Sequence, residues 1–477
     1  MLISNKLITL LKTLSKPDLN QLEKYLTSPF FNENEDLIRL FEYINKFLRT
    51  RDQTHIEQNM EKVYIWQQLF AKKKYDDVKM RRLTSDLNKL VLSFIAYKGF
   101  KNTPQSEFLY LLNSLSNSGL NKQYEGLLKQ AETAQKKSPL RDSNYHYNQF
   151  VIQQNRYRYT EKNRGNFLSA LEKTDHELDC FYFSKKLKNI CDAMSYEQFL
   201  SHQIDLKKAP GLLEYIEENG YLQIPGIKVY FLVAKMLSSE DGEPYFYQLK
   251  DFIHQYDHYF SKSELNTLFV HLKNYCIVKK INTGKQEFHF ELFSLYQISL
   301  EKEIIIDKNN LDLHHYKNII TIGLLLKEYD WVTNFIKEYT HLLQKEHREN
   351  ALTYNLAKVY FSQKRYHKVI EHLRAVPYKN KVYALGGKLI LLKTYYELKE
   401  YIALDSLIDS FRIYIRRNKL ISREVKQQYL NMLRFVKKLS GILPGDQQSI
   451  EKIQLQIDKC KALAGKKWIL EKIEELK

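Results

Sequence analysis

Glycine and proline are scarce in this chain, which contains 15 glycines and 9 prolines among its 477 residues. In an average protein the two types together make up about 12% of the residues. Leucine, lysine, glutamate and glutamine are abundant instead, and all four are good helix formers. Because so few turn-forming residues leave little room for β-structure, we expect an all-α fold.

Cysteines and long apolar runs are also few. The cysteines are Cys180, Cys191, Cys276 and Cys460. They are too few and too scattered to predict a disulfide framework or a zinc cluster. The longest apolar stretches, such as 322–326, fall far short of the roughly 20 residues that span a bilayer. Lys6 interrupts the apolar residues near the N-terminus, so we expect no signal peptide and a soluble, cytoplasmic protein.

The motifs of common enzymes are absent from the sequence. It contains no phosphate-binding loop, no Gly-x-Ser-x-Gly elbow and no His-Glu-x-x-His motif. His254 and His258 do lie four residues apart on a predicted helix, which is the spacing of a metal-binding pair. They share their face with Lys250, however, and a neighbouring cation disfavours a metal. We therefore expect no catalytic residues, no metal and no other cofactor, and a protein that is not an enzyme.

A pattern of apolar and aromatic residues recurs between residues 351 and 417. Its first copy contains Leu356, Tyr360, Tyr366, Val369 and Leu373. The next copy, 35 residues later, contains Leu391, Tyr395, Tyr401 and Leu404, and a weaker copy 37 residues upstream contains Ile319, Tyr329, Val332 and Ile336. Each copy predicts an apolar first helix, a short turn and an amphipathic second helix. Such a recurrence indicates one helical hairpin used several times, because each hairpin can bury its apolar face only against a neighbour.

The spacing of these residues resembles that of the tetratricopeptide repeat (TPR) family. That family favours glycine or alanine where this chain has Ala357 and then Leu392, and alanine where it has Val369 and Leu404. Bulkier residues at these positions imply helices held further apart and therefore irregular repeats. The whole chain is also similar to a family of large bacterial helical-repeat proteins with no assigned chemistry. The resemblance implies an α-solenoid and indicates no reaction.

We expect the chain to be organised in three parts. These are an N-terminal helical domain over 1–98, an α-solenoid of helical hairpins over 104–440, and a linker with a C-terminal amphipathic helix over 441–477. In the first part, Ser15 and Asn34 are expected to cap helices. The most regular TPR-like repeats lie at 311–417. In the last part, we expect a single helix over 450–476, which either docks as a cap or binds a partner.

The formal net charge of +18 is the strongest bias in the composition. Such a balance fits nucleic acid, a membrane surface or an acidic partner, and it is equally typical of a lysine-rich chain with solvated faces. Residues 410–438 contain nine basic residues against Glu424 alone. The basic residues of this segment are Arg412, Arg416, Arg417, Lys419, Arg423, Lys426, Arg434, Lys437 and Lys438. They suit phosphate groups or an acidic segment; alternatively, Arg416 and Arg417 simply stabilise a helix C-terminus.

A second candidate surface follows from the geometry of stacked hairpins. In a right-handed stack the first helices line the concave side, where their residues that do not face the core meet a ligand. Here those residues are Lys317, Thr321, Tyr354, Lys358 and Lys393. Three lysines and a tyrosine on one groove favour an acidic or C-terminal-carboxylate peptide, although ordinary exposed residues give the same pattern.

Two functions are compatible with these features. The first is a non-enzymatic scaffold that binds a protein or peptide partner, acidic in character, on a TPR-like concave surface. The alternative is a nucleic-acid-binding protein that uses residues 410–438. Salt separates the two, because phosphate contacts predict a steep loss of affinity between about 50 and about 200 mM salt. A groove with aromatic anchors predicts a shallow loss.

Overall fold

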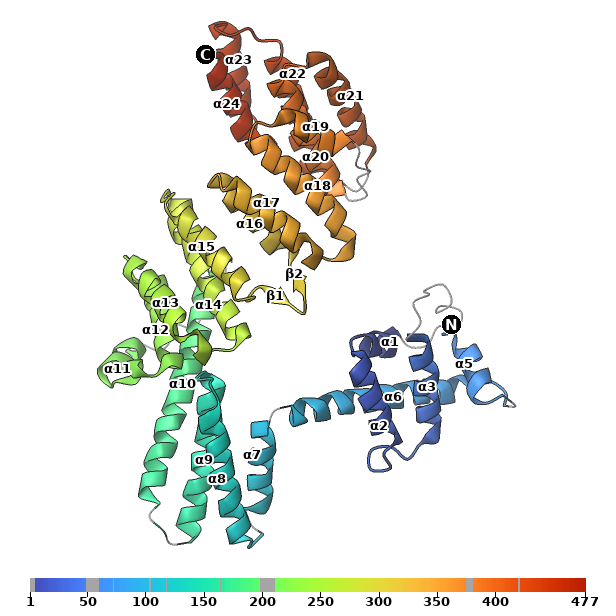
Figure 1. Ribbon diagram of the computed structural model, residues 1–477, viewed down its shortest axis with the longest axis vertical. Coiled ribbons are helices and arrows are strands. Elements are labelled where there is room, and N and C mark those ends of the chain that lie inside the picture. The colour runs from blue at the N-terminus through green and yellow to red at the C-terminus, as the bar shows by residue number, and fades with distance from the viewer. Residues whose placement is uncertain are drawn as a thin grey trace. The chain divides into compact units, whose positions relative to one another are not determined.

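The part of the protein that the structure describes is helical apart from one short hairpin of strands (Figure 1). The computed structural model describes residues 5–48, 60–71, 73–102, 104–116, 118–163, 165, 167–197, 211–374, 381–418 and 421–477. Twenty-three α-helices lie within these residues, and the expected all-α fold is confirmed. Among the described helices, none combines the length and the apolar character that crossing a membrane requires.

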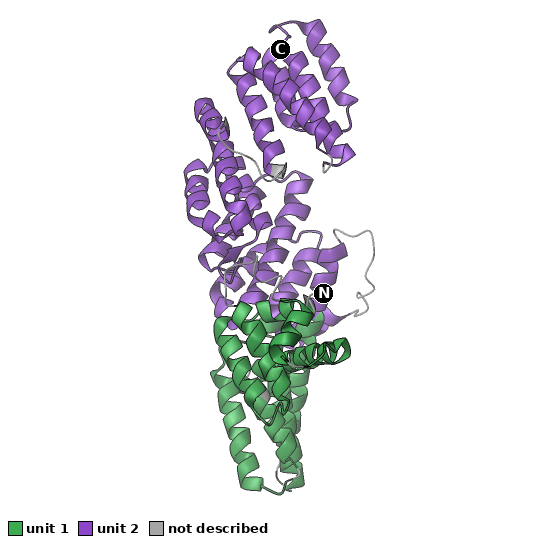
Figure 2. Cartoon of the chain, turned by 90° about the vertical axis from the view of Figure 1, so that its right-hand side faces the viewer, with its two compact units in different colours: residues 1–186, 223–227 green, residues 187–222, 228–477 purple. Residues whose placement is uncertain are grey.

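The chain divides into two compact units (Figure 2). The first consists of residues 1–186 and 223–227, and the second of residues 187–222 and 228–477. The three-part division expected from the sequence stays a prediction. One glycine shows why 223–227 belongs to the first unit: a Cβ on Gly226 would lie 2.7 Å from the carbonyl oxygen of Arg141 and 3.4 Å from Ser184 Oγ. The absence of a side chain therefore permits this close approach.

The first unit opens with five helices around an apolar core. They are α1 (Asn5–Lys12), α2 (Lys16–Thr27), α3 (Glu35–Leu48), α5 (Lys62–Leu69) and α6 (Asp77–Lys101). The expected capping box is confirmed: Ser15 Oγ accepts a hydrogen bond from the Asp18 N–H, and the Asp18 carboxylate accepts one from the Ser15 N–H, both at 3.3 Å. Asn34 Oδ1 likewise accepts from the Asp36 N–H at 3.0 Å. Leucines at 22, 26 and 40 are completely buried between these helices.

Four further helices complete the first unit and lead into the second. They are α7 (Pro104–Leu115), α8 (Asn121–Lys137), α9 (Ser143–Lys162) and α10 (Leu168–Glu197). A small core of Leu112, Tyr124, Leu128 and Ile152 joins α7, α8 and α9. Asp142 caps α9 by accepting a hydrogen bond from the Tyr145 N–H at 3.0 Å. The boundary between the units falls inside α10, after Lys186.

The second unit continues with less regular helices. They are α11 (Leu212–Glu218), α12 (Pro225–Ser238), α13 (Glu243–Tyr256), α14 (Lys262–Asn274) and α15 (Phe288–Glu301). A π-helical segment, Tyr275–Lys280, follows α14 directly. Strands β1 (Ile306–Asp307) and β2 (Asn310–Leu311) then pair antiparallel. Lys308 and Asn309 connect them with φ angles of 46° and 61°, as a two-residue type I′ turn requires.

Six helices after this turn form three successive hairpins. They are α16 (Leu313–Leu325) with α17 (Tyr329–Tyr339), α18 (Lys345–Ser362) with α19 (Tyr366–Arg374), and α20 (Lys381–Glu397) with α21 (Tyr401–Arg417). Each helix packs on the next, and the first helices also contact one another, α16 with α18 and α18 with α20. Val332, Val369 and Leu404, which recur in the sequence pattern, are all completely buried.

The same turn closes the first helix of all three hairpins. Lys327, Lys364 and Lys399 adopt left-handed backbone conformations there, with φ of 64°, 59° and 57°. In each turn the next residue donates its N–H to a carbonyl five positions back: Glu328 to Gly323 at 2.9 Å, Arg365 to Tyr360 at 2.8 Å and Glu400 to Tyr395 at 3.0 Å. This hydrogen-bond pattern is a Schellman motif, which is usually completed by glycine. The equivalent turns lie 37 and 35 residues apart, at the spacing of the sequence repeat.

The C-terminal segment forms two helices where we expected one over 450–476. After α22 (Arg423–Leu439) come α23 (Gln447–Asp458) and α24 (Lys466–Leu476). Gly465, with φ of 66°, provides the left-handed residue that reverses the chain between them. Both helices pack on α22 and on each other. Asn431 Nδ2 of α22 fixes the connecting turn by donating to the carbonyl oxygen of Ala462 at 2.7 Å.

Candidate functional site

Two lysines and two tyrosines from α16, α18 and α20 meet in one cluster. Lys317 Nζ of α16 lies 5.7 Å from the ring centroid of Tyr383 on α20. Lys358 Nζ lies 5.9 Å from the ring of Tyr354, one turn away on α18. The two rings meet edge to face, with their centroids 5.4 Å apart and an interplanar angle of 70°. We call these four residues the lysine–tyrosine cluster.

Gly386 on α20 makes room for this cluster. A Cβ at this position would lie 2.7 Å from two atoms of the Tyr354 ring system, its Cε2 and Oη. Real side-chain contacts are never so short, so any larger residue would displace the tyrosine. The repeat spacing predicts Lys317, Tyr354 and Lys358 at this surface but does not indicate Tyr383. The signal that could have revealed it is the Gly386–Gly387 pair inside a predicted helix. A glycine inside a helix often marks a place where another segment packs closely against the backbone.

The cluster carries positive charge that no carboxylate of the described residues pairs with. Burial lowers the pKa of Lys358, and the neighbouring charge of Lys317 lowers it further. Within the described part of the chain, neither lysine forms an ion pair, and the charge that acts on Lys358 is that of Lys317. The hydroxyl of Tyr383 is buried and finds no hydrogen-bond partner among the described residues. Two cations and a hydroxyl are therefore placed to meet anionic or carbonyl oxygens.

The remaining residues expected on this surface have other contacts. Thr321 is exposed, and its hydroxyl donates to the carbonyl oxygen of Lys317 at 2.8 Å within α16. Lys393 lies under the C-terminal helix α24, with its Nζ 5.4 Å from the ring centroid of Trp468. Burial lowers the pKa of Lys393, while Glu471 and Glu397 act in the opposite direction. Since α24 covers Lys393, this residue has a structural contact that the sequence did not predict.

Acidic residues just before the basic segment 410–438 balance part of its charge. Arg412 pairs with Asp409 at 3.0 Å, one turn earlier on α21. Lys437 of α22 reaches back to Asp405 of α21 at 2.5 Å. Counting charges from residue 410 onward therefore overstates the local excess, because both carboxylates precede that boundary.

The other members of the basic segment lie around the end of α21. Arg416 and Arg417 are exposed in its last turn, where the helix dipole favours cations. Lys426 Nζ lies 3.5 Å from the carbonyl oxygen of Arg416 and so caps the same helix end. Arg423 is exposed at the start of α22, and Lys419 lies outside the described residues. This arrangement serves the helix terminus and leaves several guanidinium groups open to solvent.

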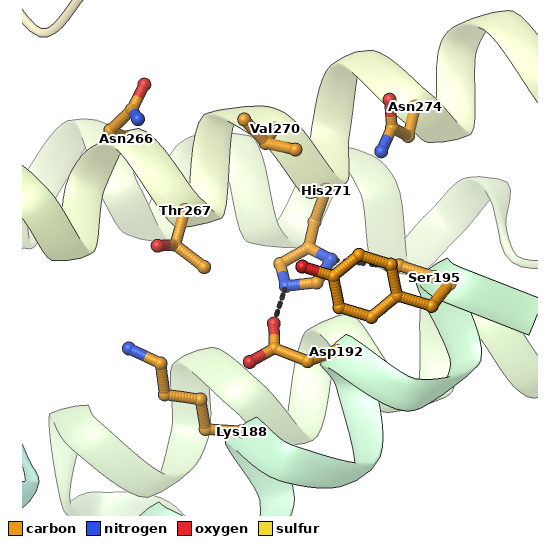
Figure 3. Close-up of a pocket in the computed structure, with 9 residues that line it drawn as sticks. Lys188, Asp192, Ser195, Asn266, Thr267, Val270, His271 and Asn274 are labelled. Atoms are coloured by element: carbon orange, nitrogen blue, oxygen red, sulfur yellow. Dashed lines mark hydrogen bonds and ion pairs between the residues drawn. The ribbon is translucent and has the colours of Figure 1, made fainter. Parts of the chain in front are cut away.

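A hollow of about 290 Å³ lies between α10 and α14. Figure 3 shows His271 pointing from α14 toward Asp192 and Ser195 of α10. Nδ1 of His271 lies 2.8 Å from Ser195 Oγ, and its Nε2 lies 3.3 Å from Asp192 Oδ1. The three side chains have the composition of a hydrolase triad. Lys188, at the rim, is paired with Glu264 at 2.5 Å.

The geometry of this hollow does not match that of a nucleophilic serine. Ser195 is only 8% exposed and lies inside a helix, where backbone N–H groups are already used by the helical hydrogen bonds. Among the described residues, the helix therefore offers an oxyanion no pair of free backbone donors beside Ser195. In addition, His271 presents Nδ1 to the serine and Nε2 to the aspartate, the reverse of the serine-protease arrangement. We interpret the contacts as a polar link that joins α10 to α14.

The histidine pair considered from the sequence is not on one regular helix. His254 lies on α13, which ends at Tyr256, and His258 lies in the following 3₁₀ turn, Asp257–Tyr259. Both imidazoles are exposed, and His258 Nδ1 lies 3.9 Å from Asp257 Oδ1. The four-residue spacing was misleading because the helix changes its geometry between the two residues.

Comparisons of the chain with protein-family models, with curated proteins and with solved structures find no match. The side chains and the packing of the helices therefore carry the argument for function. Of the surface expected from the sequence, the structure brings Lys317, Tyr354 and Lys358 together and places Lys393 against α24 instead.

Proposed function

We propose that the protein is an α-solenoid scaffold of irregular TPR-like hairpins, without chemistry of its own, that binds an acidic protein or peptide segment at the lysine–tyrosine cluster. The recurring Schellman turns and the contacts between successive first helices support the solenoid. The cluster lies on those first helices, α16, α18 and α20, which line the concave side in a right-handed stack of hairpins.

The observation that carries this proposal is a pair of lysines that have no acidic partners among the residues that the structure describes. Lys317 and Lys358 lie over tyrosine rings, and burial, together with the charge of Lys317, lowers the pKa of Lys358. A carboxylate of a ligand would remove this unfavourable interaction and form charge-assisted hydrogen bonds, each worth about 1.5–3 kcal/mol. The tyrosine rings would at the same time contact the aliphatic parts of glutamate or aspartate side chains.

A binding measurement with charge-reversed variants tests the proposal. The probe is a fluorescently labelled peptide of alternating glutamate and alanine with a free C-terminal carboxylate, followed by anisotropy. Lys317→Glu combined with Lys358→Glu should weaken binding at least about tenfold, the effect of losing about 1.4 kcal/mol. Lys337→Glu with Lys368→Glu is the matched control, because it changes the net charge equally on exposed positions of α17 and α19. Equal losses of peptide affinity in the two variants would show that the net charge of the protein, and not the cluster, attracts the peptide.

The exposed guanidinium groups around the end of α21 keep the nucleic-acid alternative open to a separate test. Arg416→Glu, Arg417→Glu and Arg423→Glu would be combined and measured against labelled single-stranded and duplex oligonucleotides. If nucleic acid is the partner, wild-type affinity falls steeply between about 50 and about 200 mM salt, and the variant reduces the slope. A scaffold for acidic peptides shows neither effect.

A further inference from the structure

Three potential metal ligands meet between α9 and α10 in the first unit. One nitrogen of His146, one carboxylate oxygen of Glu177 and the sulfur of Cys180 all lie within 4.8 Å of one another. His146 Nδ1 lies 2.8 Å from Glu177 Oε2. In a tetrahedral zinc site the bond lengths are about 2.0–2.3 Å, so ligand atoms lie about 3.3–3.7 Å apart, and only small side-chain movements separate the observed arrangement from such a site.

The helices explain why these residues meet. Glu177 and Cys180 lie three residues apart on α10 and therefore share one face. His146 lies near the start of α9, where the Asp142 cap fixes the first turn. His176 lies four residues before Cys180, with its Nε2 3.5 Å from the sulfur, so the same face of α10 also holds a potential fourth ligand.

The cluster contains polar groups whose burial is otherwise difficult to explain. His146 is 7% exposed, and its Nε2 is buried without a hydrogen-bond partner among the described residues. Cys180 is completely buried. A metal ion in the cluster would bind the imidazole through Nδ1, the nitrogen beside Glu177, and would bind the buried sulfur.

A hollow of about 250 Å³ opens beside the cluster and gives an ion a route to it. Its lining is polar and consists of Gln149, Gln153, Glu172, Lys173, His176 and Glu177. A thiol, an imidazole and a carboxylate are the ligand types that zinc prefers, whereas magnesium and calcium prefer oxygen ligands alone. One thiolate and one carboxylate also balance the two positive charges of the ion.

We propose that His146, Glu177 and Cys180 bind a divalent transition-metal ion of the zinc type, with His176 placed for the fourth position. On binding, the sulfur–metal bond forms as the Cys180 thiol releases its proton to solvent, and His146 binds as neutral imidazole. The ion joins α9 to α10 and stabilises the first unit. Residue spacing along the chain did not reveal this site because His146 comes from a different helix. The visible signal was the four-residue spacing of His176 and Cys180.

Cobalt(II) provides a direct probe of this site. The full-length, untagged chain is stripped with a chelator, dialysed and titrated with cobalt(II) chloride under nitrogen. We expect one equivalent to bind with a near-ultraviolet thiolate-to-cobalt charge-transfer band and the intense visible bands of tetrahedral cobalt, and zinc(II) to displace it. Saturation without a charge-transfer band, or no saturable binding at all, would overturn the proposal.

Variants assign the ligands. Cys180→Ala should abolish the charge-transfer band, and Glu177→Gln, a partly exposed position that preserves side-chain volume, should weaken binding at least about tenfold. Cys191→Ala is the matched control, because this thiol is also buried on α10 but donates to the carbonyl oxygen of Tyr230 at 3.3 Å. Circular dichroism checks that each variant is folded. The proposal fails if Cys180→Ala and Glu177→Gln both bind cobalt as the wild type does.

Discussion

The lysine–tyrosine cluster and the basic segment 410–438 both contain cations, but their surroundings differ. Lys317 and Lys358 are half-buried over tyrosine rings and lack acidic partners among the described residues. In the basic segment, Arg412 and Lys437 pair with aspartates of α21. The basic segment contains more cations, but some of them are already paired with aspartates. The cations of the cluster are not paired with described carboxylates, so we expect an acidic partner to neutralise them more effectively. The environment of a cation, more than the count of cations, therefore distinguishes the surface that we propose to bind a partner.

Lys273 extends the comparison to a cation that is buried. Its replacement is expected to have the largest effect on stability. Lys273 is 4% exposed on α14, its Nζ has no hydrogen-bond partner among the described residues, and burial lowers its pKa from 10.5 to about 8. The unfolded chain therefore holds the proton between pH 8 and pH 10.5 while the folded chain releases it, so stability rises with pH across this window. Lys273→Met should raise the free energy of unfolding at pH 7 by about 3 kcal/mol.

Urea unfolding of wild type and Lys273→Met at several pH values measures this effect. The difference between the two proteins should shrink as the pH rises through 8 and disappear above about 10.5. Exposed Lys337 on α17 provides the control, because Lys337→Met should change stability by less than about 0.5 kcal/mol at every pH. A constant difference across the whole range would show that lost or gained packing, and not the buried charge, is responsible.

The glycine beneath Tyr354 gives the next largest effect. Gly386→Ala forces the ring away from α20 and should lower the free energy of unfolding by about 1–2 kcal/mol through overpacking. Gly126→Ala on α8 is the opposite case, since a Cβ there meets nothing within 4 Å. It should stabilise the protein by about 0.5–1 kcal/mol. Thermal unfolding of both variants checks the contrast, and the same sign in both would contradict the close packing of Tyr354.

The recurring turns predict a smaller gain. Lys364 adopts a left-handed conformation with φ of 59°, which costs a non-glycine residue about 1–2 kcal/mol. Lys364→Gly should therefore stabilise the protein by about 0.5–1 kcal/mol after the greater flexibility of the unfolded chain is counted. Lys368→Gly, inside α19, should instead destabilise it by about 1 kcal/mol. Chemical unfolding distinguishes the two, and a loss of stability in Lys364→Gly would argue against the Schellman turn.

Neutralising one lysine of the cluster should have the smallest effect on stability and a clear effect on binding. Lys358→Met removes the cost of burying this charge and its repulsion with Lys317. The variant should be slightly more stable than wild type and should bind the acidic peptide more weakly. Arg416→Met, at an exposed helix end, should leave peptide binding unchanged. Lower stability and unchanged peptide affinity in Lys358→Met would show that Lys358 is not part of the binding site.

Local features of the fold could be predicted, and contacts between distant segments could not. The caps at Ser15 and Asn34 depend on neighbouring residues, so the sequence was sufficient to predict them. The break at Gly465 was missed because amphipathic spacing continues on both sides of it, through Ile457 and Ile469. The left-handed conformations of the three turn lysines could not be predicted either, since glycine is the residue normally expected there.

The candidate sites show the same distinction between local and distant information. Lys317 and Lys358 were predicted from the repeat spacing, whereas Tyr383 joins them only through the packing of α20 on α18. Lys393 occupies the position in its repeat that Lys358 has in the one before, yet α24 covers it from 75 residues away. The carboxylates that balance Arg412 and Lys437 were missed because they lie before the boundary of the counted segment.

The most direct test compares the two cationic surfaces in one experiment. Wild type, the Lys317→Glu/Lys358→Glu variant and the Arg416→Glu/Arg417→Glu/Arg423→Glu variant are each titrated with the acidic peptide and with an oligonucleotide, at about 50 and about 200 mM salt. The account predicts that only the first variant loses peptide affinity, by at least about tenfold, and that wild-type peptide binding depends weakly on salt. Peptide binding that survives in the first variant, or tight oligonucleotide binding lost only in the second, would contradict it.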